Sequence, residues 1–279
     1  MLTLCAALCV GLALLQGGTD TTVAARLNAR LELDVPAGSI TVRTWDRAAV
    51  RVVAEHGPGV AVRVQASDSL VRVRHQSRRV AAVDYRITVP RAMRLSLGGR
   101  DADIDVAGAE GPVSAANNTG RIRIDGGRGP VRVESILGEI EVVGVRGRVT
   151  ARSLDAAIRL RDVQGEVDVE SSSNNIVLEG VDAGAVRAQS VAGAIEFRGP
   201  LRPGGTYELT THSGPISVFP TGAVDAEVSV AAVQGDFECE FPYVPRGPHR
   251  RGIVSFVLGR GAARLDVQSF GGRIRLARP

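Results

Sequence analysis

The central part of the sequence alternates apolar and polar residues in a pattern that repeats every eighteen or nineteen residues. Each repeat reads G-x-V-x-V-x-S-x-x-G-x-I-x-V, and the repeats begin at Gly111, Gly129, Gly147, Gly165 and Gly184. Each repeat contains two pairs of apolar residues. The members of a pair are two positions apart, which is the periodicity of a strand and not of a helix. Every repeat is therefore predicted to form a rung of two short strands joined by turns.

Alignment of the rungs places similar apolar residues in vertical columns. The first column is Val113, Val131, Val149, Val167 and Val186, and a second is Ile122, Ile140, Ile158, Ile176 and Ile195. One rung cannot bury its apolar side alone, whereas stacked rungs share a continuous core. Equivalent strands of successive rungs then run in the same direction. The pattern predicts an all-β fold, a single-stranded parallel β-solenoid or β-helix with two main faces.

Two further columns mark the turn after the first strand of each rung. The small polar column is Asn117, Ser135, Ser153, Ser171 and Ser190, and the turn column is Gly120, Gly138, Ala156, Asn174 and Gly193. We expect the polar side chains to hydrogen-bond the turn backbone. We expect the turn column to need a positive φ, with Ala156 as an exception. A stacked serine column could also form a binding ladder, and the sequence leaves that alternative open.

The residues on either side of the regular repeat predict atypical end units, which solenoids need to protect the exposed core. Residues 26–110 alternate less regularly and are predicted to form an N-terminal β cap and starter sheet, although 31–42 has the spacing of a rung. Regular rungs are predicted over 111–240. A basic, proline-rich loop and a closing rung follow over 241–279, so that 26–279 form one continuous domain.

The beginning of the chain predicts export. Residues 2–15 form an uncharged apolar run that is too short for a comfortable membrane span and resembles the hydrophobic region of a secretory signal, although the basic n-region is missing. We predict a signal peptide over 1–25, cleaved between 17 and 25, with an uncleaved N-terminal anchor as the alternative. No later stretch predicts a membrane span. The expected location is the periplasm, the outer membrane surface or the extracellular space.

Charge on the outward positions predicts salt-bridge ladders, because opposite signs fall on neighbouring rungs, as at Arg123, Glu141 and Arg159. Two segments lack this alternation, and we consider them as possible polyanion-binding sites. Their residues are Arg72, Arg74, Arg78, Arg79, Arg246, Arg250 and Arg251. The alternative is a solvated edge that prevents sheet-to-sheet aggregation. The formal net charge is only +4, and we expect no nucleic-acid partner.

Catalytic chemistry has weak support in the sequence. The nearest candidates for an acid and base pair are Asp236, Glu238 and Glu240, which alternate along one strand and are typical of a solvated face. Four histidines, His56, His75, His212 and His249, are scattered. No zinc-binding spacing is present, and we predict no catalytic residues, metal or cofactor. Cys239 shares a column with Val218, so we expect it in the core.

Several stretches resemble a bacterial domain-of-unknown-function family that is labelled "putative adhesin". They are GSITVRTWDRAAVRVV at 38–53, YRITVP at 85–90, the G-x-V-x-V-x-S rungs, and the ending GDFECEFP with LGRGAARLDVQSFGGRIRL. The resemblance implies an all-β repeat fold in an exported or envelope-associated protein without established catalytic residues. Three functions are considered: a non-enzymatic envelope protein that binds an envelope or extracellular polymer or protein, a periplasmic regulatory or scaffold protein, and a carbohydrate-active β-helix enzyme.

Overall fold

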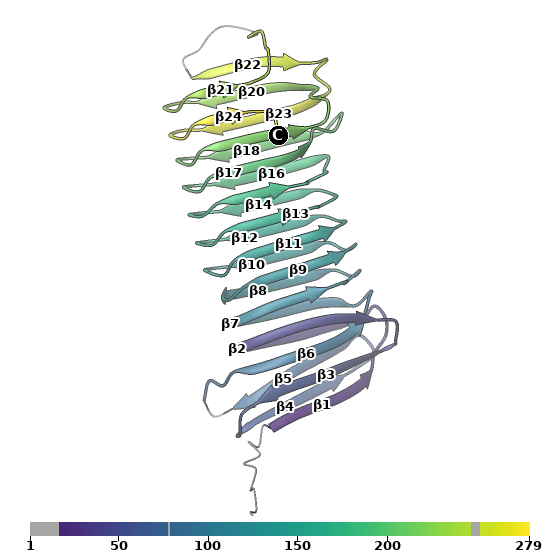
Figure 1. Cartoon of the computed structure of the whole chain (residues 1–279). Coiled ribbons are helices and arrows are strands. Elements are labelled where there is room, and N and C mark those ends of the chain that lie inside the picture. Colours follow the sequence, from purple (N-terminus) through teal and green to yellow (C-terminus); the bar gives the residue numbers. More distant parts are fainter. Residues whose placement is uncertain (1–16, 78, 247–251) are drawn as a thin grey trace, which may run out of the picture.

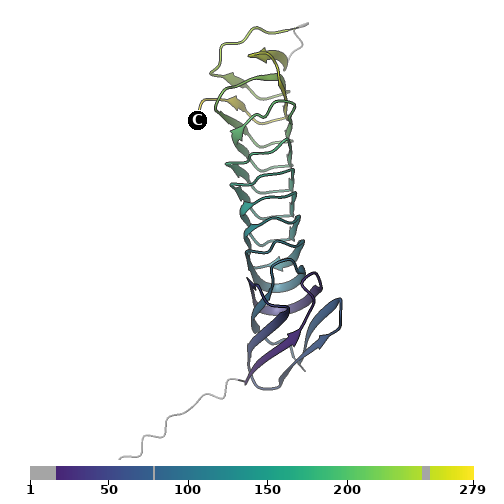
Figure 2. The ribbon, with the colours of Figure 1, turned by 90° about the vertical axis from the view of Figure 1, so that its right-hand side faces the viewer.

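Equivalent strands of successive rungs lie side by side and run in the same direction along an elongated stack (Figure 1). This is a computed structural model, and it describes residues 17–77, 79–246 and 252–279. The described residues form 24 strands and no helix. Figure 2 shows the stack from the side, with two long sheets joined by turns at every rung. The prediction of an all-β parallel solenoid with an irregular N-terminal region is confirmed.

The two faces take alternate strands of the chain. The first face contains β8 (Val113–Thr119), β10 (Val131–Ser135), β12 (Val149–Ser153), β14 (Val167–Ser171), β16 (Ala185–Ser190) and β18 (Thr206–Thr211). The second contains β9 (Ile122–Gly127), β11 (Ile140–Val145), β13 (Ile158–Arg161), β15 (Ile176–Glu179), β17 (Ile195–Pro200) and β19 (Ile216–Thr221). Val131 pairs with Val113 and Val149, and Ile140 pairs with Ile122 and Ile158. The register is the one predicted from the columns.

The core lies between the faces and is almost entirely aliphatic. Ile122, Ile140, Ile158 and Ile176 are fully buried, and burial of each such side chain contributes about 1.5–3 kcal/mol. A third buried column, Val145, Val163 and Val181, lies at the turn that returns the chain to the first face. A short bridge ladder through Gln164 supports this turn. This column was not predicted, although it keeps a regular spacing from the first column. Val145 and Val163 lie four residues before a first-column valine, and Val181 lies five residues before one.

The small polar column makes the predicted turn hydrogen bonds. The Oγ atoms of Ser135, Ser153 and Ser190 each accept the backbone N–H three residues later, at 2.8–2.9 Å. Thr211 and Ser269 do the same at 3.0 and 2.8 Å. All of these side chains are buried. They complete the turn backbone and do not form an external binding ladder.

The reason proposed for glycine in the turn column is wrong at most positions. Gly120 has a φ of 88°, but Gly138 and Gly193 do not have positive φ, and neither do Ala156 and Asn174. A Cβ atom on Gly138 would instead overlap the carbonyl oxygen of Gly120 in the rung beneath. Close stacking of neighbouring turns, and not backbone conformation, therefore excludes a side chain at Gly138.

The N-terminal cap is built around two long strands that each cross both faces. These are β2 (Arg30–Trp45) and β7 (Arg94–Ala107), which pair in parallel. On its other side β2 pairs with β5 (Leu70–Ser77) and β6 (Val83–Pro90), and these pair antiparallel with β4 (Val60–Ala66) and β3 (Ala49–His56). The Trp45 indole N–H donates to the Ala49 carbonyl at 2.8 Å and closes the β2–β3 turn.

The outermost strand of the cap lies inside the segment that we assigned to the signal peptide. Strand β1 (Gly17–Ala24) pairs antiparallel with β3 along its whole length. Arg51 also donates two hydrogen bonds to the Asp20 carboxylate, at 3.0 and 2.6 Å. The described part of the cap therefore includes Gly17–Ala24, eight residues that we assigned to the signal peptide. Residues 1–16, which contain the whole apolar run, lie outside the described residues.

The C-terminal end differs from the predicted order of rungs. The last rung in the sequence, β23 (Ala263–Ser269) with β24 (Ile274–Leu276), pairs with β18 and β19. The preceding rung, β20 (Ala226–Ala232) with β21 (Phe237–Cys239), lies outside it. Strand β22 (Ile253–Leu258) pairs antiparallel with β20 and turns the chain back. The predicted closing rung is thus inserted, because the direction of stacking reverses where β22 folds back antiparallel on β20.

Candidate functional site

A groove of about 590 Å³ crosses the first face at its N-terminal end. We call it the cap groove and define it by the residues Glu32, Asp34, Arg72, Arg74, His75, Ser96, Gly98, Ser114 and Ala116. Strands β7 and β8 place small outward residues on its floor, whereas β2 and β5 place long charged residues on its wall. This difference between neighbouring strands hollows the otherwise flat sheet. The groove brings together Arg72 and Arg74, two of the predicted polyanion-binding residues.

The charges in the cap groove are only partly neutralised. Arg72 donates two hydrogen bonds to the Glu32 carboxylate, at 2.9 and 2.7 Å. These bonds hold the pKa of Glu32 below its usual value. Arg74 instead lies opposite Arg63 on the antiparallel partner strand β4. Like charges in that position repel, so Arg74 is the arginine of this groove best suited to an external anion.

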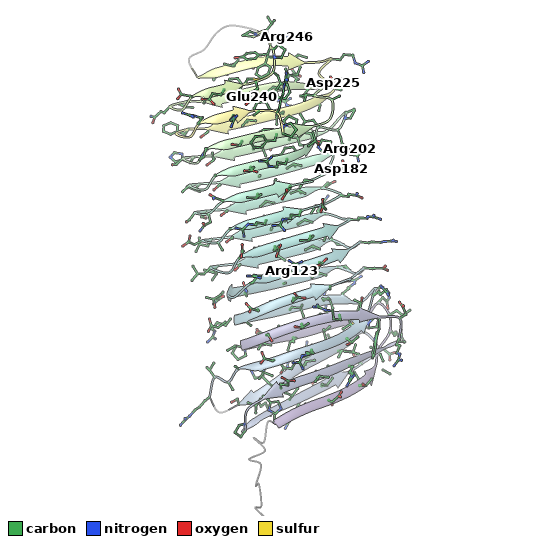
Figure 3. The ribbon with its side chains drawn as sticks, viewed as in Figure 1. Arg123, Asp182, Arg202, Asp225, Glu240 and Arg246 are labelled. Carbon is green, nitrogen blue, oxygen red and sulfur yellow. The ribbon has the colours of Figure 1, made fainter. Side chains whose placement is uncertain are left out.

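The other predicted basic residues do not join this groove. Arg79 is exposed beyond the end of β5, and Arg246 is exposed at the opposite end of the stack (Figure 3). Arg78, Arg250 and Arg251 lie outside the described residues. The two basic segments therefore belong to opposite ends of the molecule and cannot form a single patch.

Carboxylates from other strands neutralise several arginines in and near the N-terminal basic segment. Arg86 forms an ion pair with Glu55 at 2.6 Å, and Arg91 forms one with Asp46 at 2.6 Å. The neutralising carboxylates come from β2, β3 and the turn between them, so the sequence around these arginines does not show them. Fewer arginines are available to a ligand than the sequence indicated.

The three carboxylates considered for catalysis lie on or next to the short outer strand β21. Glu240 accepts a hydrogen bond from Arg275 at 2.6 Å and another from the Arg278 backbone N–H at 3.1 Å. The hydrogen bond from Arg275 is the main cause that lowers the pKa of Glu240, and the bond from the Arg278 backbone acts in the same direction. Glu238 lies 3.5 Å from Arg273. A lowered pKa is the opposite of what a general acid at neutral pH requires.

The three histidines that the structure describes lie on or next to three different strands. His56 lies at the end of β3, where its Nε2 is 3.4 Å from the Thr19 hydroxyl, and His75 lines the cap groove. His212 is at the end of β18 and stacks on Phe270. His249 lies outside the described residues. Within the described ranges, no group of three or more His, Cys, Asp or Glu side chains is arranged to hold a metal ion.

Cys239 occupies the predicted column but is less buried than expected. It pairs with Leu276, which in turn pairs with Val218. The expectation of a core position is wrong, because β21 belongs to the outermost rung and one side of Cys239 has no further rung to cover it. Partial burial still raises the pKa of its thiol.

The second face carries the predicted ladder of ion pairs. Glu141 contacts Arg123 at 2.6 Å and Arg161 at 3.6 Å, so one carboxylate links three rungs. Glu139 pairs with Arg159 from the next rung. Figure 3 shows Arg123 about halfway along the stack, on this regular surface. In each of these pairs, a group on a neighbouring rung neutralises the charge.

Comparisons with known proteins add nothing to the fold assignment, which rests on the strand pairing described above. The chain matches no protein-family model and no curated protein. It is similar to a crystal structure described as a "putative cell adhesion protein" from Clostridium sporogenes, with 7% identity and a TM-score of 0.31, over 94% of this chain and 100% of that one. Likeness at this level carries no argument about function. Among the described residues, no helix is long and apolar enough to cross a membrane. What is confirmed is an all-β repeat architecture.

Proposed function

We propose that this chain is a non-enzymatic, exported cell-envelope protein, an adhesin or interaction scaffold that presents a repetitive solenoid surface to an envelope or extracellular polymer or protein. The observation that carries the proposal is the pairing of outward carboxylates with arginines of the same or neighbouring rungs. Glu141, Glu170 and Glu240 are all held in this way. A hydrolase needs a carboxyl group with a raised pKa beside a second carboxylate, whereas paired charges favour a stable, extended recognition surface.

Export is the part of the proposal that rests on the sequence. The apolar run over 2–15 precedes a β-domain whose described part contains a single cysteine, Cys239. A periplasmic regulatory or scaffold role would use the same surface with a different partner. The decisive first experiment is therefore fractionation of the source bacterium, followed by incubation of the purified protein with isolated envelope polysaccharides.

The proposal expects the protein in the periplasmic, outer membrane or extracellular fraction. It also expects co-sedimentation with an envelope polymer whose chain length does not change during incubation. Recovery only from the cytoplasm would contradict the location. Release of new reducing ends would contradict the non-enzymatic role and favour the carbohydrate-active alternative.

If the partner is anionic, binding should start at the ends of the stack. Arg74 and Arg79 are the described N-terminal candidates, and Arg246 is the described C-terminal one. Replacing Arg74 and Arg79 by Ser removes two exposed positive charges and should weaken binding to dextran sulfate several-fold. The measurement is made at low salt, because exposed charges are screened beyond about 8–10 Å at physiological ionic strength. The matched control replaces Arg159 and Arg161, which are already paired with Glu139 and Glu141. An equal effect of both double variants would exclude a specific role for the cap.

A further inference from the structure

A second groove, of about 490 Å³, lies towards the C-terminal end of the stack. It runs along the edge of the first face, where the strands of that face end and the turns begin. We call it the edge groove and define it by the residues Gln189, Val191, Thr210, His212, Ala231, Val233, Gln268 and Phe270. They come from four rungs that are adjacent in space, in the order β16, β18, β23 and β20. The groove exists only because the last rung of the sequence is inserted between β18 and β20.

Besides the buried side chains of Ser171, Ser190, Thr211 and Ser269, its lining has two parallel rows. One row is polar and uncharged, since Gln189 pairs with Thr210 and Thr210 pairs with Gln268. The other row is apolar and aromatic: Val191 and Val233 are 56% and 55% exposed, and Phe270 is 43% exposed. Between these valines the rings of His212 and Phe270 stack in parallel with centroids 5.1 Å apart. Exposed apolar groups arranged in a row mark an interaction site more often than scattered ones do.

The polar row is the continuation of a charged ladder that stops at the groove. On the preceding strands the same outward position is Glu134, Arg152 and Glu170, with Arg152 and Glu170 3.3 Å apart. Glu170 then pairs with Gln189, and the next two positions are also uncharged. Apart from Glu170 at one end, the lining therefore contains no Arg, Asp or Glu along the length of the groove. A charged polymer would gain little there.

We propose that the edge groove binds a neutral, extended polysaccharide. Amide groups both donate and accept hydrogen bonds and hydroxyl groups do the same, so Gln189, Thr210 and Gln268 match the hydroxyls along a sugar chain. The apolar row matches the C–H surfaces of the sugar rings, and the stacked pair provides the aromatic area that burial favours. The lining repeats with the strand spacing of about 4.8 Å, which is close to the length of one pyranose unit in an extended glycan.

This inference deepens the proposed function, on which it rests, because it names a ligand class for the solenoid surface. Its test uses the purified protein and isothermal titration with cellohexaose, xylohexaose, mannohexaose and chitohexaose. At least one hexasaccharide should bind with a Kd of 1 mM or tighter. Phe270→Ala and Gln268→Ala should each weaken that binding at least tenfold. Raising the salt concentration from 50 to 500 mM should change it less than twofold.

The matched control is Leu154→Ala, which removes an exposed aliphatic side chain from the same edge but outside the groove. It should change the affinity less than twofold, and all variants should unfold at the wild-type temperature within a few degrees. Three results would overturn the inference: none of the four sugars binds at 1 mM, Phe270→Ala binds like wild type, or Leu154→Ala loses as much affinity. A dimer in sedimentation equilibrium that Phe270→Ala abolishes would also overturn it, by showing that a second copy covers the groove. Fractionation tests the proposed function separately, so sugar binding can fail while export and envelope association hold.

Discussion

Tyr207 of β18 lies directly beside Leu265 of β23 in the parallel sheet, although strands β19 to β22 come between them in the sequence. The last rung is therefore an interior rung, and the rung before it closes the stack. The Asp225 carboxylate helps to fix this arrangement, since it accepts the backbone N–H groups of Arg260 and Ala262 at 2.7 and 3.0 Å. The order of rungs decides which side chains line the edge groove.

This order can be tested by disulfide cross-linking in a Cys239→Ser background. Thr206 pairs with Arg264, whereas Glu227 lies one strand further on, beside Arg264. Neighbouring strands are about 4.8 Å apart, within the Cα separation that a disulfide accepts, and second neighbours are not. We expect the Thr206→Cys, Arg264→Cys variant to form an intramolecular disulfide on mild oxidation, measured by non-reducing electrophoresis and mass. The control pair Thr206→Cys, Glu227→Cys should stay reduced. The opposite result would restore the sequential order of rungs.

Two buried tyrosines should respond differently to loss of their hydroxyl groups. The Tyr207 hydroxyl donates to the Ala183 carbonyl at 2.8 Å and accepts the Arg202 backbone N–H at 2.8 Å. Tyr207→Phe should lower the free energy of unfolding by about 1–3 kcal/mol, because buried polar groups lose their partner. The Tyr85 hydroxyl is buried without a partner among the described residues, so Tyr85→Phe should be neutral or stabilising. Urea unfolding of both variants decides this, and a larger loss from Tyr85→Phe would contradict it.

Tyr85 should also make stability fall at alkaline pH. Burial raises its pKa to about 12, whereas an unfolded tyrosine has a pKa near 10. Below pH 10 both states keep the proton and the residue adds no pH dependence. Between pH 10 and 12 only the unfolded state releases it, so unfolding becomes more favourable as pH rises.

The comparison with Tyr85→Phe isolates this contribution from the other titrating groups. Wild type should lose about 1.4 kcal/mol relative to the variant between pH 9 and pH 11, since each unit of pKa difference corresponds to about that energy. Unfolding free energies measured at the two pH values give the difference. Parallel pH profiles for the two proteins would show that the Tyr85 hydroxyl reaches water.

The alternation of buried and outward residues predicts a steep contrast on β15. Ile176 is fully buried, whereas its neighbour Val177 faces outward and is partly exposed. Ile176→Ala should lower the free energy of unfolding by about 2–5 kcal/mol, as large-to-small core changes do. Val177→Ala should cost much less. Equal losses in denaturant unfolding would refute the assignment of faces.

The sequence predicts the central rungs because every local signal there agrees. Spacing by two, stacked aliphatic columns and the Ser135-type turn bonds all specify the same rung. The ends are harder because their pairing is between distant segments. Nothing local to Leu265 shows that it pairs with Tyr207, and nothing local to Thr19 shows that β1 pairs with β3. An apolar leader and an edge strand both have few charges, so the boundary between them has no clear signal.

Candidate sites were predictable only where one strand supplies them. Arg72 and Arg74 alternate on β5 and appear together in the sequence, and they do line the cap groove. The edge groove joins residues from four rungs that are not in sequence order, so no motif marks it. The sequence does carry one signal for this groove: Gln189, Thr210 and Gln268 stand in an outward column that holds charged residues on the preceding rungs.

The measurement that tests the central claim most directly is the N-terminal sequence of the protein isolated from its source organism. Export predicts a processed chain in the envelope or extracellular fraction. Because β1 pairs with β3 along its whole length and Asp20 pairs with Arg51, processing should leave nearly all of this strand in place, with a mature start at Gly18 or Thr19. A start at Arg26 would keep export but remove β1 from the mature fold. An intact chain beginning at Met1, recovered only from the cytoplasm, would contradict the account of an exported envelope protein.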